Sequence, residues 1–210
     1  MSDYLTCQEL QIYIMEEVSE KIIKGGNTFS QPGSLKYLLF GSERSEQSLC
    51  IKMGKIGEEM VKKILIEHPT LELLQCGVQC IDPSTGKNKD IDLIWIDKYN
   101  KIIFYREAKG NIELDSEKLP ATINKVKEII EMYIVPSYPD YTLNIAVFNW
   151  SIYNRNELKK GLSQIKKCEN KHNIAVEHPS DLFKLLDFDW SEESYYSFFR
   201  EVGKRLRSEI

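Results

Sequence analysis

Apolar residues recur along this chain with two periods, one that fits helices and one that fits strands. The segments with helical spacing are residues 5–24, 55–68, 116–134, 154–169, 180–186 and 191–209. The shorter apolar runs that favour strands are residues 71–82, 142–150 and 173–178, in addition to a hairpin. This order of elements predicts an α/β fold in which a mixed central β-sheet is flanked by helices.

The hairpin is predicted between Lys89 and Asn111, where two apolar runs are joined by a short polar turn. The runs are apolar on both faces, as the first one illustrates: Ile94 and Ile96 alternate there with Leu93 and Trp95. Strands of this kind are usually covered by helices on both sides. We therefore expect the hairpin to be buried within the sheet.

The length of the turn decides which side chains of the hairpin meet. With a two-residue loop at 99–100, Asp92 lies opposite Glu107, and Asp90 lies opposite Lys109. Because side chains two apart on a strand share a face, all four would then point the same way. A three-residue loop would instead place the acids on opposite faces.

Charged groups at the end of a buried strand are costly unless they are paired or bind a metal. Mg²⁺ prefers oxygen ligands and keeps several waters, and a metal-bound water is a better nucleophile. Asp92, Glu107 and Lys109 therefore indicate metal-dependent cleavage of phosphodiesters. The alternative is a non-catalytic interaction protein, in which the same residues form only an ion network at the rim of the sheet.

The combined pattern resembles the PD-(D/E)xK nuclease superfamily, and by size its type II restriction endonucleases. It consists of a helix with Gly57-Glu58, a strand with Asp92 and a strand that ends in Glu107-x-Lys109. The matching core covers about residues 54–150. The resemblance implies a Mg²⁺-dependent endodeoxyribonuclease that cleaves double-stranded DNA at a specific short sequence and leaves 5′-phosphate and 3′-hydroxyl ends. A structure-specific repair or junction-resolving nuclease of the same fold is the runner-up.

The resemblance also implies a role for each residue. Asp92 and Glu107 would ligate Mg²⁺, and Ala108 would contribute its backbone carbonyl. Lys109 would orient the attacking water or stabilise the developing charge. Glu58 would complete the acidic cluster, often through water or a second ion.

Two features leave this assignment open. Asp90 competes with Asp92 for the role of strand ligand, and Ile91 replaces the proline that usually precedes the aspartate. On the helix at 55–68, a rotation of about 100° per residue places Glu58 at the margin of the apolar face and Glu59 in solvent. Glu58 is therefore the helix acid that can reach the sheet.

Two segments are candidates for contact with DNA. The loop before the hairpin carries short polar and basic side chains, namely Ser84, Thr85, Lys87, Asn88 and Lys89. The segment 27–48 carries Lys36 and Arg44 and could wrap the duplex. The loop could equally be a solvated turn, and the segment a dimer arm. Because cutting both strands usually takes two active sites, we expect a homodimer.

Composition adds little to this interpretation. The chain is 42% hydrophobic and 29% charged, as in an ordinary globular protein, and has a net charge of −4. Many nucleic-acid binders are basic, so local lysines would have to meet the phosphates. We expect one nuclease domain over 1–210, with its core at 54–180 and with residues 1–53 and 190–210 serving dimerisation or DNA wrapping.

The remaining expectations concern the compartment and the cysteines. No apolar run is long enough to span a membrane, and the N-terminus lacks the features of a secretory signal, so we expect a cytoplasmic protein. Five scattered cysteines are most simply reduced thiols. Cys76, Cys80, Cys168 and His172 could form a zinc site. However, residues four apart on a strand are roughly 13 Å apart, so buried thiols are the preferred interpretation.

Overall fold

The computed structural model describes residues 4–24, 38–39, 46–114, 117–158 and 162–209. Within them, a five-stranded sheet has the order β1-β4-β5-β6-β7. Its strands are β1 (Leu71–Leu73), β4 (Leu93–Asp97), β5 (Ile102–Lys109), β6 (Thr142–Asn149) and β7 (Ala175–Glu177). β1, β4 and β5 are antiparallel neighbours, whereas β5, β6 and β7 run parallel. The predicted α/β fold with a mixed central sheet is therefore confirmed.

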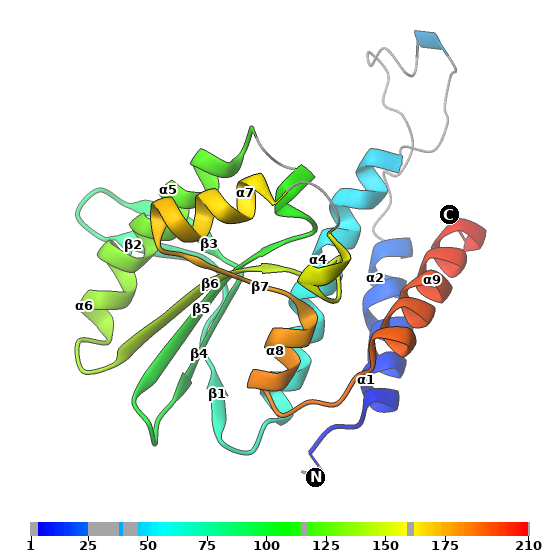
Figure 1. Cartoon of the computed structure of the whole chain (residues 1–210), viewed down its shortest axis with the longest axis horizontal. Coiled ribbons are helices and arrows are strands. Elements are labelled where there is room, and N and C mark those ends of the chain that lie inside the picture. Colours follow the sequence, from blue (N-terminus) through cyan, green and yellow to red (C-terminus); the bar gives the residue numbers. More distant parts are fainter. Residues whose placement is uncertain (1–3, 25–37, 40–45, 115–116, 159–161, 210) are drawn as a thin grey trace.

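Helices cover both faces of this sheet (Figure 1). The bounds on one side are α1 (Cys7–Tyr13), η1 (Ile14–Val18), α2 (Ser19–Lys24), α4 (Glu46–Glu67), α8 (Pro179–Leu185) and α9 (Glu192–Glu209). Those on the other side are α5 (Leu119–Ile129), η3 (Ile130–Ile134), α6 (Val135–Ser137), α7 (Ser163–Lys166) and η5 (Lys167–Lys171). α4 lies against the sheet, and the N-terminal helices and α9 pack outside it.

The strand side chains divide between two cores with the period expected of a strand. Leu93 and Trp95 pack on the side of α4 and α9, whereas Ile94 and Ile96 pack on the side of α5. All four are buried. The prediction of a hairpin that is apolar and covered on both faces is confirmed.

The single strand predicted over 71–82 is wrong. The chain forms β1 and then β2 (Gly77–Asp82), and β2 pairs with β3 (Lys87–Ile91) in a separate two-stranded sheet. Gly77 begins β2 with a φ of +88°, a conformation that glycine adopts readily. The apolar pattern continues on both sides of Gly77, so periodicity alone does not reveal that the strand is interrupted there.

The helix predicted over 154–169 is also wrong. Its first part is a short 3-10 turn, η4 (Arg155–Glu157), and the helix begins only at Ser163. Asn154 accepts a hydrogen bond from the backbone N–H of Asn156, and Glu157 accepts one from that of Asn154. These local bonds offer the backbone an alternative to the helix.

The other helices lie close to their predicted positions. α4 is longer than expected and begins at Glu46, and Pro120 lies in the first turn of α5 as predicted. No helix in the described part of the chain combines the length and the apolar character needed to cross a membrane.

Candidate active site

The turn between β4 and β5 keeps the predicted register. Leu93 pairs with Arg106 and Asp97 pairs with Ile102, so the same ladder places Asp92 opposite Glu107. The loop itself is wider than two residues, because Asp97 accepts hydrogen bonds from the backbone and side chain of Asn100 at 2.9 and 2.7 Å. The three-residue alternative, which would separate the acids, does not occur.

Asp92, Glu107 and Lys109 meet at the carboxyl end of β5. The two acids are buried, with 7% and 1% of their surface exposed. Glu107 Oε1 lies 2.9 Å from the ammonium of Lys109, and the hydroxyl of Tyr105 donates to Glu107 Oε2 at 3.0 Å. Asp92 Oδ2 accepts the backbone N–H of Ala108 at 2.9 Å. The structure thus places Lys109 against Glu107 and Asp92 beside the next residue of the same strand.

Lys125 completes this cluster, and sequence reasoning missed it. Its ammonium lies 3.0 Å from Asp92 Oδ1 and 2.7 Å from Glu107 Oε2, so it bridges the two acids. Lys125 belongs to α5, which connects the parallel strands β5 and β6 and packs over the acid-bearing face. In the sequence it resembles the other lysines of a solvated helix face, and only the packing of α5 reveals its position.

The two acids respond differently to this environment. Burial, and then the charge of Glu107, raises the pKa of Asp92 to about 7. Burial alone would also raise the pKa of Glu107, but Lys109 and Lys125 together hold it below its ordinary value. Asp92 therefore binds a proton more readily than an ordinary aspartate, whereas Glu107 keeps its charge to lower pH than an ordinary glutamate.

Glu58 lies near the cluster without joining it through a direct bond. Its carboxylate forms an ion pair of 3.5 Å with Lys62, and its side chain is 24% exposed, against 36% for Glu59. Burial, and then the charge of Asp90, raises the pKa of Glu58, while Lys62 opposes the shift. The charge of Glu58 in turn contributes to the raised pKa of Asp92.

Asp90 does not take the position expected of it. It pairs with Val78 in the β2–β3 sheet and is exposed, whereas Lys109 pairs with Asn149 of β6. The expected pairing of Asp90 with Lys109 is wrong, because the chain leaves the hairpin ladder at Asp92 to form β3. Asp92 is therefore the strand carboxylate that faces Glu107.

Of the residues predicted to contact DNA, those of the β2–β3 turn lie in the described part of the chain. Ser84 and Thr85 donate to the carboxylate of Asp82, each at 2.6 Å, and so close the β2–β3 turn. Asn88 is exposed. Lys87 and Lys89 pair with Glu128 of α5 at 3.0 and 2.7 Å, which partly offsets their charge. Lys36 and Arg44 lie outside the described residues.

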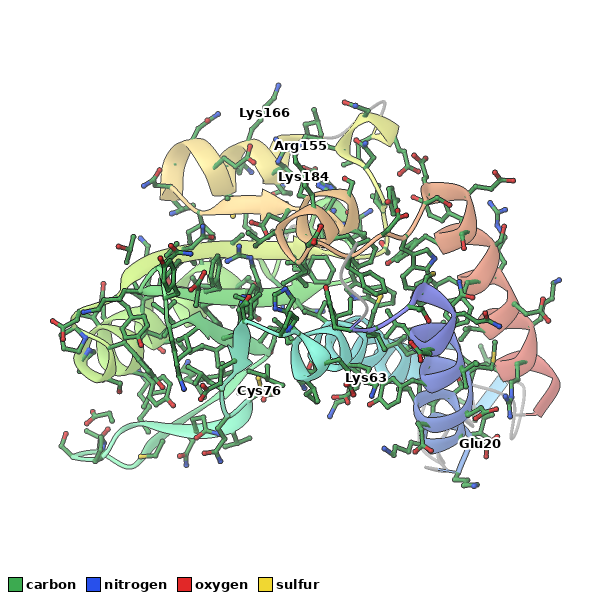
Figure 2. The ribbon with its side chains drawn as sticks, turned by 90° about the horizontal axis from the view of Figure 1, so that it is seen from below. Glu20, Lys63, Cys76, Arg155, Lys166 and Lys184 are labelled. Atoms are coloured by element: carbon green, nitrogen blue, oxygen red, sulfur yellow. The ribbon has the colours of Figure 1, made fainter. Side chains whose placement is uncertain are left out.

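The four cysteines in the described part of the chain are free thiols. Cys7 and Cys76 are partly buried, Cys80 is exposed and Cys168 is buried, and Figure 2 shows Cys76 on the ribbon at the sheet end of the molecule. Among the described residues, no group of three or more His, Cys, Asp and Glu side chains is arranged to hold a metal by itself. A metal at Asp92 and Glu107 would therefore need backbone oxygen and water as further ligands.

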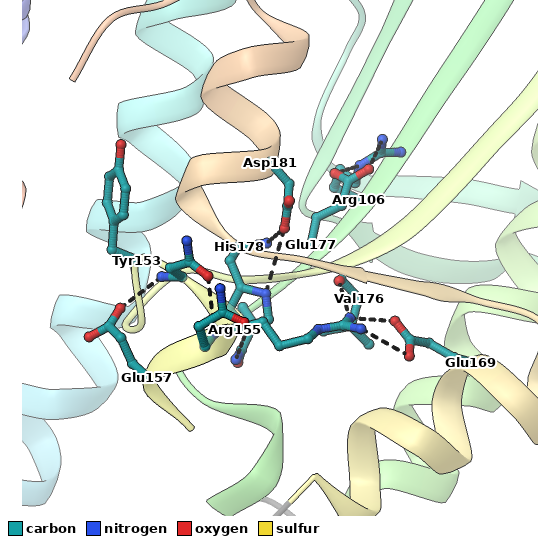
Figure 3. A network of polar contacts seen from close by, with 12 residues as sticks. Arg106, Tyr153, Arg155, Glu157, Glu169, Val176, Glu177, His178 and Asp181 are labelled. Carbon is teal, nitrogen blue, oxygen red and sulfur yellow. Dashed lines mark hydrogen bonds and ion pairs between the residues drawn. The ribbon is translucent and has the colours of Figure 1, made fainter. Parts of the chain in front are cut away.

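A second buried charge lies across the sheet from this site and was also missed from the sequence. Arg106 is fully buried and donates to both carboxylate oxygens of Glu177 at 2.6 and 2.7 Å (Figure 3). It also donates to the backbone and side-chain oxygens of Asn144 at 2.7 and 2.8 Å. Arg106 thus ties β5 to β6 and β7.

Comparison of the chain with protein-family models, with curated proteins and with solved structures gives no significant match.

Proposed function

We propose that this protein is a Mg²⁺-dependent endodeoxyribonuclease that cleaves double-stranded DNA at a short specific sequence, as type II restriction enzymes do. The observation that carries the proposal is the pair of buried carboxylates of Asp92 and Glu107, which meet beside the ammonium of Lys109. Two buried acids that lie close together repel each other unless a cation or a proton offsets the charge. In this proposal the protein acts as a homodimer in the cytoplasm.

The donor set fits a hard divalent cation. Asp92 and Glu107 offer carboxylate oxygens, the ligands that Mg²⁺ prefers. Ala108 directs its backbone N–H toward Asp92, and the carbonyl of the same strand residue points to the same edge. Bound there, Mg²⁺ would supply a water of lowered pKa and would neutralise charge on the phosphate.

The protein groups have separate tasks in this mechanism. Lys109 holds its ammonium on Glu107 Oε1, where it can orient a water or stabilise negative charge on phosphate oxygens. Tyr105 donates to Glu107 Oε2 and fixes the orientation of that carboxylate. Glu58 adds negative charge near Asp92 and serves as an outer acid.

The proposal is tested by incubating the protein with unmethylated phage DNA and Mg²⁺ and sequencing the fragment ends. We expect discrete fragments with 5′-phosphate ends, and rates that fall by about 10²–10³-fold in Glu107→Gln and Lys109→Met. Lys63→Met and Glu67→Gln remove a surface ion pair of 2.6 Å on α4 and should keep the parent rate. Absence of cleavage with both Mg²⁺ and Mn²⁺ would contradict the proposal.

One observation favours a second candidate, a non-catalytic interaction protein. Lys125 already bridges Asp92 and Glu107, so the acids are offset without a metal. For that candidate, the same variants lower stability and no DNA is cut. If cleavage occurs only on branched DNA, the protein is instead a structure-specific nuclease of the same fold.

A further inference from the structure

The carboxylate oxygens of the two site acids all have partners within the protein. Asp92 accepts from Ala108 on Oδ2 and from Lys125 on Oδ1. Glu107 accepts from Lys109 on Oε1 and from Tyr105 on Oε2, which also contacts Lys125. A cation shared by both acids must therefore enter a site in which every oxygen is already hydrogen-bonded.

These partners differ in charge and in whether they contact one acid or both. Among the described residues, Lys125 is the one group in direct contact with both carboxylates. Ala108 and Tyr105 are neutral donors that each bind one acid, and Lys109 touches Glu107 alone. Only the ammonium of Lys125 therefore stands between the acids, where a shared divalent ion would lie.

We propose that Lys125 is an internal counter-ion that competes with the divalent metal for the two carboxylates. The inference rests on the proposed function and names a positioning residue for its metal centre. A divalent ion and an ammonium within a few ångströms repel each other strongly in a site shielded from water. The metal therefore binds with the loss of both Lys125 contacts, and this loss weakens its affinity.

The side chain of Lys125 is able to leave. The side chain of Lys125 is 21% exposed, so its bridging position borders on solvent. Its four-carbon stem allows the ammonium to swing away from the acids without movement of α5. Thr122 and Val126, which are buried on the same helix, keep the backbone of α5 on the sheet. Binding of the metal therefore requires movement of the Lys125 side chain but no movement of the α5 backbone.

The test measures binding of Ca²⁺ alone, without DNA, by isothermal titration calorimetry of the full chain. We expect Lys125→Met to bind Ca²⁺ at least ~10-fold more tightly than the parent, because a positive charge has been removed from the site. Lys125→Arg, which keeps the charge, should stay within a few-fold of the parent. Lys127→Met removes an exposed charge two positions along α5 and should change the affinity by less than about twofold.

Stability of the variants gives a second readout. Lys125→Met leaves two acids without their shared cation, so we expect a lower Tm without metal and a larger rise in Tm on addition of Ca²⁺ than in the parent. If Lys125→Met does not fold, Lys125→Gln replaces the ammonium with a neutral donor and carries the same expectation. Ca²⁺ binding that is unchanged or weaker in these variants would overturn the inference.

Ca²⁺ binding and DNA cleavage together distinguish a failure of the Lys125 inference from a failure of the proposed function. If the parent cleaves DNA and binds Ca²⁺, but the Lys125 variants bind it no better, the inference fails and the proposed function stands. If neither the parent nor the Lys125 variants bind Ca²⁺ or Mn²⁺ at millimolar concentration, the metal centre fails and the inference falls with it. Asp92→Asn should abolish binding in every background, which locates the ion at this site.

Discussion

At the scale of single residues, the two acids of the site differ in the groups that surround them. Glu107 is held by two ammonium groups, and Asp92 by one ammonium and one backbone N–H. Burial raises the pKa of Asp92 to about 7, and the lysines lower the pKa of Glu107. The same pair of carboxylates therefore contributes to stability with opposite dependence on pH.

Asp92→Asn should flatten the pH dependence of stability. The pKa of Asp92 is raised from its ordinary value of 3.8 to about 7, so its contribution is present at low pH and is lost as the pH rises through 7. In the parent without metal, the free energy of unfolding should fall by up to about 1.4 kcal/mol per pH unit between pH 5 and 7. Urea titrations of the parent and the variant at several pH values measure this change in the free energy of unfolding.

Glu107 does not interfere with that measurement. Its pKa is lowered, so its contribution is present above its ordinary value of 4.5 and is lost only as the pH falls below that value. Equal slopes of unfolding free energy between pH 5 and 7 in the parent and in Asp92→Asn would show that Asp92 does not titrate in this range.

At the scale of elements, helix α4 approaches the sheet closely at one glycine. A Cβ built on Gly57 would lie 2.6 Å from the ring of Trp150, which follows β6 and is buried. Trp150 is held in place by Phe199 of α9, with ring centroids 5.7 Å apart. Glu58 comes directly after Gly57, so this close approach involves the turn of α4 that carries that acid.

Gly57→Ala should destabilise the protein by about 1–3 kcal/mol, because the added methyl group overpacks a rigid ring. This cost exceeds the gain of up to about 1 kcal/mol that alanine gives in a helix. Gly54→Ala is the matched control on the same helix, since a Cβ there meets no atom within 4 Å. That variant should be neutral or slightly stabilising. Urea unfolding of both variants decides between these outcomes, and equal stabilities would contradict the close approach of α4.

At the scale of the whole molecule, a buried ion pair connects the parallel half of the sheet. Arg106 extends from β5 past β6 to Glu177 on β7, and its guanidinium lies over the rings of Trp95 and Phe104 at 5.2 and 5.7 Å. A second pair, Arg155 with Glu169, lies nearer the surface and connects η4 to η5 (Figure 3).

Glu177→Gln should cost about 3 kcal/mol or more, because it leaves the charge of Arg106 buried and unpaired. Glu169→Gln, which disrupts the half-exposed pair with Arg155, should cost less than about 1 kcal/mol. The free energies of unfolding in urea provide the comparison. A Glu177→Gln variant as stable as Glu169→Gln would mean that Arg106 finds solvent or another acceptor.

The sequence predicted those parts of the fold that depend on local periodicity. The hairpin, its register and the meeting of Asp92 with Glu107 follow from alternation along two short strands. Lys125 and Arg106 could not be placed in this way, because their partners lie 33 and 71 positions away. The break at Gly77 was missed because the residues on both sides of it continue one apolar pattern.

The turn at Lys98–Lys101 has a consequence far from itself. One residue more or less in this turn would slip the register and rotate Asp92 onto the side of α4, away from Lys125 and Glu107. Replacing the exposed residues of this turn leaves the strand register unchanged. Changing their number by one moves Asp92 away from Glu107 and Lys125 at the other end of the hairpin. An exposed loop at the other end of the hairpin therefore tolerates changes in composition better than a one-residue change in length.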